Sequence, residues 1–386
     1  MSVWTTDAST VRGFTSPEPR RLSPGPEPIN GVDVYRYSVR YLPAQRITRT
    51  VAHWLPLGTR WKCDMLRWTP YVPSLTRAAK EPHAPIDLVH AAGLPYSSVL
   101  YAGVQLAQSS GARLVISPFT HVPPPGPKGA RMRSAYLSPL NVRLLGCADR
   151  LFVQTALEKR VLSDAGLPSS RLTVVGLGID PADTAGGNRA RGRAGWHVAA
   201  DTVAIGHLAN KSWDKGTVDL IDAADRLWAR GRTFVLVLAG PEMPSFTQRW
   251  ARAAHRDRIV NLPELSDQDR RDFFAGLDVY ALPSYVESFG LSPLEAALNG
   301  AAVIAYDHGG PGEIFEHDVN ALLAPAGDLE ALAAALDRVV IDGQARARLA
   351  AAGRQVALRH PWPRVLETAM SIYDELIQGG HREQTR

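Results

Sequence analysis

The chain has 386 residues, of which 45% are hydrophobic and 21% are charged, so it is long enough for about two to three domains and too apolar to be disordered throughout. No stretch reaches the roughly 18 consecutive apolar residues that cross a bilayer, and the N-terminal residues lack a secretion signal. The two cysteines, Cys63 and Cys147, belong to no cluster with histidine, which argues against a zinc motif or a disulfide framework. We therefore expect a cytoplasmic enzyme or binding protein.

Positive charge is concentrated in the first half of the chain. The net charge is +5, with +10 carried by residues 1–180 and −5 by the remainder. A proline cluster, Pro123–Pro127, is followed by Lys128, Arg131 and Arg133, and predicts an exposed loop that opens onto a basic segment. The excess of positive charge in this half is consistent with an anionic partner, such as an acidic membrane face or a phosphorylated acceptor. Arginines that are simply solvated would give the same net charge. No nucleic-acid-binding motif accompanies the charge, so nucleic acid is not an expected partner.

The first half alternates short apolar runs with segments of helical length. The runs are rich in Val, Ile and Leu, which is typical of strands buried on both faces of a parallel sheet. Helical stretches separate them, as at Tyr96–Ser109 and Ala156–Ala165. This rhythm predicts a doubly wound α/β domain over residues 1–180. The predicted strands are Ile86–His90, Arg113–Ser117, Arg150–Gln154 and Leu172–Val175.

The stretch Gly178–Gly195 is rich in Gly, Pro and Arg and lacks apolar periodicity, so we interpret it as a linker. The alternation then resumes and predicts a second Rossmann-like domain over residues 181–361, which would face the first across a cleft. Residues 362–386 contain a predicted helix that begins at Trp362 and crosses back to the first domain. The second set of predicted strands is Val203–Leu208, Phe234–Leu238, Ile259–Asn261, Val279–Leu282 and Val303–Ala305.

Ligands of open α/β sheets bind beyond the carboxyl ends of the strands, which makes the loops there the candidate sites. The strand Val279–Leu282 is followed by a loop with Glu287 and Gly290, and then by a helix that contains Glu295. Backbone N–H groups at a helix start attract anions, and Gly290 lets a phosphate approach the chain. Glu295 is placed to accept hydrogen bonds from ribose hydroxyls, and Glu287 faces what lies beyond the phosphates. As isolated carboxylates, both are more typical of capping or solvated residues than of ligand-binding groups, and the spacing together with the loop favours the binding site.

Two further loops at strand ends carry weaker signals. One contains Lys211 and Lys215 before a helix start, a pair of cations that suits a diphosphate, although Lys-Gly is also a common turn. The other contains the turn Gly309-Gly310, which would bring backbone amides to a ligand or simply end a strand.

Two histidines and one acidic pair complete the candidates. His121 follows one predicted strand and His90 ends another, and either imidazole could donate to a ligand hydroxyl or phosphate, or be a structural residue. Asp267 and Asp269 follow Ser266, and we interpret them as the acidic first turn of a capped helix and not as a metal site.

In their order and spacing these motifs resemble the donor-site signature of family-4 retaining glycosyltransferases, which have the GT-B architecture. The resemblance rests on the spacing of Glu287 and Glu295, on the turn from Gly309 to Glu313, and on Lys215 at a helix start. The closing helix at Trp362 also matches, and the similarity covers essentially the whole chain.

The resemblance implies a nucleotide-sugar donor in the cleft, bound mainly by the second domain and without a divalent metal or another cofactor. Glu295 would hold the ribose, while Glu287 and His121 would contact the donor hexose as the catalytic residues. Lys211 and Lys215 would neutralise the diphosphate. Further donor contacts would come from the loop and helix start formed by Ser288, Phe289, Gly290 and Leu291.

The sequence departs from the family pattern at two places. Members of the family begin with an extra strand and a Gly-rich loop ahead of the strand that Ser2–Thr6 represents, so we expect the N-terminal domain to lack its first strand. They usually have Gly-Arg-Leu where this chain has Gly206-His207-Leu208. His207 would then be a weaker phosphate contact, or Lys211 would replace the arginine.

The sequence thus predicts a cytoplasmic retaining glycosyltransferase that moves a hexosyl group from a UDP- or GDP-sugar to a hydroxyl acceptor in glycan, glycolipid or polysaccharide synthesis. The basic first half suggests a lipid-linked or otherwise anionic acceptor and peripheral contact with an anionic membrane. The alternative is a non-catalytic sugar-nucleotide-binding accessory protein or a truncated, inactive homologue. An epimerase or phosphorylase of the same architecture would need an acid pair or a cofactor lysine, and the sequence identifies neither.

Overall fold

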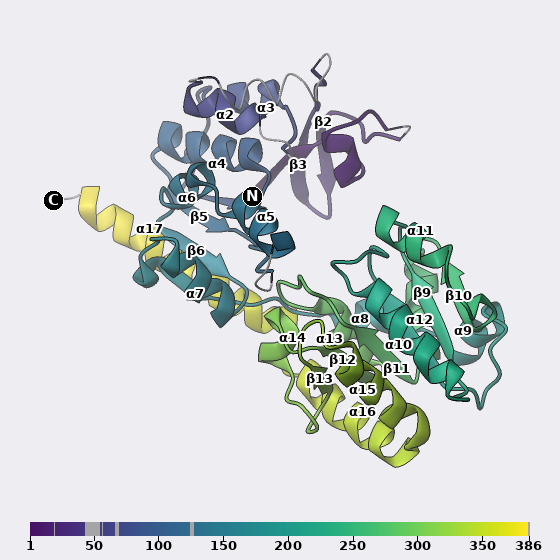
Figure 1. The fold of residues 1–386 in the computed structure, drawn as a ribbon. Coiled ribbons are helices and arrows are strands. Elements are labelled where there is room, and N and C mark those ends of the chain that lie inside the picture. The colour runs from purple at the N-terminus through teal and green to yellow at the C-terminus, as the bar shows by residue number, and fades with distance from the viewer. Residues whose placement is uncertain (19, 43–54, 56, 66–68, 124–126, 385–386) are drawn as a thin grey trace.

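The computed structural model describes residues 1–18, 20–42, 55, 57–65, 69–123 and 127–384, and Figure 1 shows their arrangement. The first half contains two sheets. A three-stranded sheet has the order β1-β3-β2, with β1 parallel and β2 antiparallel to β3, and a four-stranded parallel sheet has the order β4-β5-β6-β7. The strands are β1 (Ser2–Thr6), β2 (Gly25–Ile29), β3 (Val32–Tyr37), β4 (Leu88–Ala92), β5 (Arg113–Ser117), β6 (Arg150–Val153) and β7 (Leu172–Val174).

Helices cover the four-stranded sheet because each buries an apolar face against it. Leu100, Val104 and Ala107 of one helix pack with Val89 and Ile116 of the strands in a single core cluster. The helical elements of this half are η1 (Val11–Phe14), α2 (Thr59–Met65), α3 (Pro73–Ala78), α4 (Ser97–Ser110), α5 (Pro127–Tyr136), α6 (Pro139–Leu145), α7 (Ala156–Asp164) and η2 (Ser169–Arg171).

The second half is built on one six-stranded parallel sheet in the order β10-β9-β8-β11-β12-β13. Successive strands are added on one side of β8 as far as β10 and on its other side from β11 onward. The neighbours β8 and β11 therefore form the switch point of the sheet, and the loops that follow them meet at the same edge. The strands are β8 (Ala204–Leu208), β9 (Val235–Ala239), β10 (Ile259–Leu262), β11 (Val279–Leu282), β12 (Ala302–Tyr306) and β13 (Leu322–Ala324).

Layers of helices bury both faces of this sheet, as the α/β prediction requires. Leu220, Ile221 and Leu227 of one helix pack against Leu236 and Ile304 of the strands. The helical elements are α8 (Pro181–Thr184), α9 (Arg189–Gly195), α10 (Thr217–Ala229), α11 (Pro244–Trp250), η3 (Arg256–Arg258), α12 (Asp267–Gly276), α13 (Leu291–Leu298), α14 (Gly309–Ile314), α15 (Leu329–Ile341), α16 (Gly343–Ala357) and α17 (Trp362–Gln384).

The segment interpreted as a linker is structured, which corrects that prediction. It contains the short helices α8 and α9, and arginines fasten it to the second half. The Arg193 guanidinium is buried and donates to the carbonyls of Gly276 and Ala199, each at 3.0 Å, and Arg191 forms an ion pair with Asp272. The sequence of α8 and α9 lacks apolar periodicity because arginine side chains and backbone groups, and not an apolar helix face, attach these helices to α12.

The basic segment onto which the predicted proline loop opens is a helix. Helix α5 begins at Pro127, a residue whose fixed φ and missing N–H suit a first helical position. Its Arg133 lies in the last turn, where a cation is favourable. The intervening residues 124–126, which belonged to the predicted loop, lie outside the described residues.

The strand predicted at the start of the chain is present as β1, but it belongs to a separate sheet. Trp4 on β1 packs against Tyr35, Tyr37 and His83, with ring centroids between 5.2 and 6.3 Å apart. Among the described residues, β1 pairs with β3 and β4 pairs with β5, and no ladder joins β1 to β4.

The chain passes between the two halves at two adjacent places. The first passage runs through Ile179 into the second half, and the second returns through His360 and Trp362. The Ile179 carbonyl accepts from Trp362 N–H at 3.3 Å, and Ile179 N–H donates to the His360 carbonyl at 2.8 Å. A Cβ on Gly178 would lie only 2.6 Å from the Trp362 backbone, so glycine is required for this close approach.

After the return passage, α17 packs on the four-stranded sheet of the first half (Figure 1). Its Tyr373 ring stacks on Phe152 at 5.6 Å, and the Tyr373 hydroxyl shares a 2.5 Å hydrogen bond with Nδ1 of His90. Arg150 and Glu375 form an ion pair at 3.1 Å nearby. Neither α17 nor any other helix in the described part of the chain is long and apolar enough to cross a membrane.

Removing the Tyr373 hydroxyl tests this attachment. Tyr373→Phe should lower the free energy of unfolding by about 1 kcal/mol, because it deletes one hydrogen bond and leaves the His90 ring nitrogen without its partner. Urea unfolding of the wild type and the variant measures the change. Tyr35→Phe is the control, since Tyr35 is partly exposed on β3. Equal stability of the two variants would contradict a role for the His90 contact.

Candidate active site

The loop after β11 is fixed to the loop after β8 by backbone contacts. Tyr285 N–H donates to the Asp214 carbonyl at 2.9 Å, and a Cβ on Gly216 would lie 1.8 Å from the Pro283 carbonyl oxygen. Gly216 also has φ +72°, in the left-handed region that favours glycine. These contacts hold together the loops that lead into α10 and α13, at the switch point of the sheet.

This arrangement brings together the predicted residues Lys215 and Glu287. The Lys215 Nζ lies 2.9 Å from Glu287 Oε2 and 2.9 Å from the Val286 carbonyl oxygen. Both side chains keep part of their surface exposed. The ammonium is thus oriented by two acceptors while one side of the pair remains open to a ligand.

The first half contributes His121 from the loop after β5. Its Nδ1 shares a 2.8 Å hydrogen bond with the Tyr136 hydroxyl at the end of α5. Burial lowers the pKa of His121, Lys215 lowers it further, and the carboxylates of Glu287 and Asp214 oppose the shift. His121 therefore lies within electrostatic range of the Lys215 and Glu287 pair, and burial together with Lys215 favours its neutral form.

Glu295 lies one turn inside α13 and is held by a residue that the sequence analysis missed. Its Oε1 accepts from the Arg270 guanidinium of α12 at 2.7 Å. Burial raises the pKa of the Glu295 carboxyl, and Arg270 opposes that shift. No spacing in the sequence links α12 to α13, so Arg270 carried no signal. Tyr136, the partner of His121, was missed because it lies 15 residues further along the chain and no motif links the two.

The four residues of the helix start have different surroundings. Gly290 is the N-cap of α13 with φ +101°, and Leu291 is the first helical residue. Phe289 is buried, and its ring lies against Gly176 of the first half, where an added Cβ would be 3.3 Å away. Ser288 lies between this buried ring and Glu287 in the loop. That these four residues hold a donor remains a prediction.

Lys211 is not brought into this group, contrary to the expectation of a second diphosphate cation. The side chain is 1% exposed, and its Nζ donates to Leu262 O at 2.8 Å and also to Asn261. Glu242 lies 3.5 Å away. Burial lowers the pKa of the Lys211 amine, and Glu242 opposes that change. These partners are on the β10 side of β8, whereas Glu287 follows β11 on the other side.

Two other histidines make internal contacts, which is contrary to the phosphate contact predicted for His207 and agrees with the structural alternative given for His90. His207 is fully buried in β8, where its ring nitrogens lie 2.8 Å from Ala281 O and from the Thr217 hydroxyl, so it cannot touch a phosphate. Burial lowers its pKa to about 4. His90 contacts Ser117 and Tyr373 of α17, and it therefore serves packing between elements.

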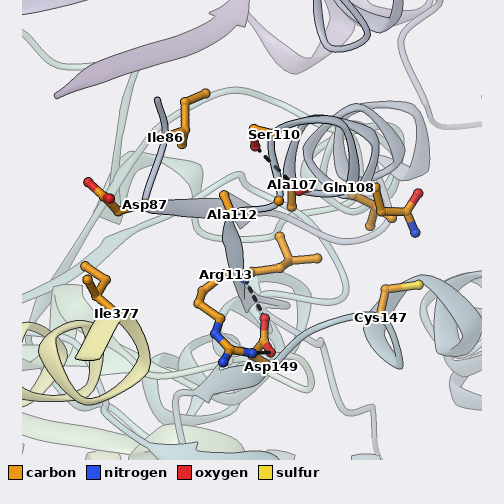
Figure 2. Close-up of a pocket in the computed structure, with 13 residues that line it drawn as sticks. Ile86, Asp87, Ala107, Gln108, Ser110, Ala112, Arg113, Cys147, Asp149 and Ile377 are labelled. Atoms are coloured by element: carbon orange, nitrogen blue, oxygen red, sulfur yellow. Dashed lines mark hydrogen bonds and ion pairs between the residues drawn. The ribbon is translucent and has the colours of Figure 1, made fainter. Parts of the chain in front are cut away.

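A cavity of about 520 Å³ lies elsewhere. It is lined by residues of α4, α17 and the starts of the strands β4 and β5 (Figure 2). An ion pair between Arg113 and Asp149, at 3.2 Å, forms part of its wall. This is the amino-end edge of the sheet, opposite the edge where His121 lies, and ligands of open α/β sheets bind at the carboxyl ends. We therefore place the active site at the Lys215 and Glu287 pair.

Known structures with this arrangement of sheets show the class of fold. Sucrose-phosphate synthase from Thermosynechococcus elongatus superposes with a TM-score of 0.76 at 19% identity, over 98% of this chain and 89% of that one. Anabaena HepE in complex with UDP-glucose superposes with a TM-score of 0.66 at 21% identity, over 88% and 86% of the two chains. The protein thus has the GT-B fold, as predicted.

Family models and curated relatives identify the family. Residues 196–356 match the model for glycosyl transferases group 1, and residues 9–178 match the model for a glycosyl transferase 4-like domain. The chain belongs to this glycosyl transferase family. Two relatives named D-inositol 3-phosphate glycosyltransferase are similar to it. The one from Saccharomonospora viridis is 34% identical over 60% of this chain, and the one from Xylanimonas cellulosilytica is 30% identical over 67%. The matches span 56% and 66% of those relatives' lengths.

The buried His207 predicts a loss of stability in acid. Its folded-state pKa of about 4 lies below the roughly 6.5 of an unfolded histidine, so the unfolded chain binds more protons and stability is lost as the pH falls from about 6.5 towards 4. At pH 5 this loss is about 2 kcal/mol.

Urea unfolding of the wild type and His207→Asn at pH 7 and pH 5 measures this effect. The variant is expected to be less stable at pH 7 and to lose about 2 kcal/mol less than the wild type on acidification. Equal losses in the two proteins would show that His207 does not take up a proton on unfolding.

Proposed function

We propose that the protein transfers a hexosyl group, with retention of configuration, from a nucleotide-diphosphate sugar to a hydroxyl acceptor. The observation that carries the proposal is the 2.9 Å ion pair of Lys215 and Glu287 at the switch point of the sheet, within electrostatic range of His121 from the other half. A cation, a carboxylate and an imidazole contributed by the two halves suit a donor that has a charged diphosphate at one end and a polyhydroxylated ring at the other. Membership of the glycosyl transferase family supports the same reaction.

Each side chain has a role that follows from its chemistry. Negative charge develops on the departing nucleoside diphosphate, and Lys215 together with the N-terminus of α13 would stabilise it. Glu287 and His121 would bind hydroxyls of the hexose from opposite sides. Glu295, oriented by Arg270, would accept hydrogen bonds from the ribose hydroxyls. Lys215 and the helix start would supply the positive charge at the diphosphate, so we propose a reaction that needs no divalent metal or cofactor.

The acceptor proposed here is an anionic or lipid-linked molecule with a free hydroxyl group. Two observations support it. The first 180 residues carry a net charge of +10, which attracts anions, and the relatives cited above are named for a phosphorylated inositol. Retention would follow from attack on the same face of the sugar, with the leaving phosphate taking the acceptor proton. Synthesis of a glycan, glycolipid or polysaccharide at the cytoplasmic side of a membrane would use such a reaction.

Donor binding is tested by a thermal-shift panel of UDP-, GDP- and ADP-sugars, each with and without EDTA. One base class should stabilise the wild type by about 2.7 kcal/mol at 100 times its dissociation constant, and EDTA should not change the shift. Glu295→Ala should weaken this ligand roughly tenfold or more, because a carboxylate that accepts hydroxyl hydrogen bonds is lost.

The exposed Glu330 of α15 provides the control for that panel, and Glu330→Ala should bind like the wild type. A folded wild type that no nucleotide sugar stabilises would contradict the proposed function. Binding of a nucleotide sugar without hydrolysis or transfer would favour the accessory protein instead.

Contact with anionic membranes is tested by co-sedimentation with liposomes. Vesicles that contain phosphatidylserine should retain the protein at low ionic strength and release it at 0.5 M salt, because screening shortens electrostatic attraction. Vesicles of phosphatidylcholine alone are the control. Equal binding to the two kinds of vesicle, or binding to neither, would overturn the proposed membrane contact.

A further inference from the structure

Helix α14 packs without a gap against the loop that contains Glu287. Gly310 N–H donates to the Glu287 carbonyl at 3.3 Å. A Cβ on Gly309 would lie 2.1 Å from that oxygen, and one on Gly310 would lie 1.8 Å from Phe289 O. Only glycines permit such an approach, so any movement of α14 also moves the Glu287 loop.

The same helix reaches the other half of the protein at both of its ends. His308, the residue before α14, donates from Nε2 to the carbonyl of Val122 at 2.7 Å. Val122 is the neighbour of His121. Near the other end, the Glu313 carboxylate accepts from the backbone N–H groups of Ala156 at 2.7 Å and Leu157 at 2.5 Å, which are the first two residues of α7.

Glu313 therefore caps a helix that belongs to the opposite half. The first N–H groups of a helix have no partner inside the helix, and a carboxylate there also interacts favourably with the helix dipole. Thr155 completes the cap because its hydroxyl accepts from Glu158 N–H at 3.1 Å. The Arg160 guanidinium lies 3.8 Å from Glu313 and adds to the attraction.

The first turn of α7 leads back to the His121 loop through Glu158. This side chain is 1% exposed, and its two oxygens accept from Gln154 N–H at 2.7 Å and from Thr120 N–H at 2.5 Å. Burial raises the pKa of the Glu158 carboxyl, and these hydrogen bonds oppose the rise. Thr120 precedes His121, and Phe119 before it has φ +51°, a strained conformation that its surroundings must hold in place.

We propose that Glu313 is a positioning residue, which caps α7 from the second half and thereby holds Glu158 and the His121 loop opposite the Glu287 loop. The catalytic consequence rests on the proposed function, whereas the mechanical link does not. Contacts run from the Glu287 loop through α14, Glu313 and α7 to Thr120, and the chain then continues to His121. The cap thus connects the two sides of the candidate active site through contacts that are present without a ligand.

Hydrogen exchange of the full chain, measured by mass spectrometry, tests the link. The variants are Glu313→Gln, which removes the charge and one of the two acceptors, and the control Glu316→Gln, an exposed residue just beyond α14. Loss of a helix cap corresponds to roughly fivefold easier opening. We expect Glu313→Gln to exchange about fivefold faster in residues 155–158 and also in residues 117–123, with no change in the control. Faster exchange in 155–158 alone, or in neither segment, would overturn the proposal.

A second variant and a kinetic measurement separate this role from general damage to the fold. Glu158→Gln should speed exchange in 117–123 directly, since the amide cannot accept from both backbone N–H groups.

The kinetic measurement follows the release of the nucleoside diphosphate from the nucleotide sugar that binds best. Glu313→Gln should lower kcat at least tenfold and leave KM for the donor within twofold. A parallel loss of donor affinity would show that Glu313 acts on binding and would overturn the positioning role. If the wild type binds no nucleotide sugar, the proposed function fails, and the exchange experiment still decides the link.

Discussion

The absence of a side chain at Gly216 allows the loops after β8 and β11 to touch, and the candidate site depends on that contact. The Pro283 carbonyl occupies the space in which a Cβ would lie. Because of this approach, Tyr285 N–H reaches the Asp214 carbonyl, and Lys215 is held between the Val286 carbonyl and the Glu287 carboxylate. A larger residue would separate the loops, and the ammonium would lose both acceptors together. The cation of the site is therefore positioned by backbone packing as well as by its ion pair.

The two halves of the protein meet through polar groups that are each satisfied by a specific partner. His308 donates to a carbonyl, and Glu313 accepts from two backbone N–H groups. Hydrogen bonds of this kind depend on direction, so they define the position of one half relative to the other more narrowly than apolar contact of equal strength. An active site divided between two sheets needs such definition, because the imidazole of His121 and the carboxylate of Glu287 come from different halves.

The sequence was sufficient for most strands of the two parallel sheets and for the central pair of the site, because both follow from local pattern and chain order, but it did not indicate β2, β3 or β13. The strands β5 and β11 have the predicted limits, and Lys215 and Glu287 follow neighbouring strands at the switch point. Lys211 could not be placed in this way, since its direction depends on Asn261 and Leu262, which lie two strands away in the sheet. Arg270 and Glu313 were beyond reach for a similar reason, as their partners lie on elements that are distant in sequence. The spacing of motifs therefore predicts which loops meet. The direction of a side chain such as Lys211 depends on hydrogen-bond acceptors contributed by elements that are distant in sequence.

The paired passages of the chain at Ile179 and at Trp362 have a consequence for motion. Two neighbouring segments joined by hydrogen bonds resist twisting more than a single connection does, so the paired passages restrain the rotation of one half relative to the other. Because α17 packs on the four-stranded sheet of the first half, the second passage is anchored there by apolar contacts. Any opening of the site would therefore have to bend both passages together.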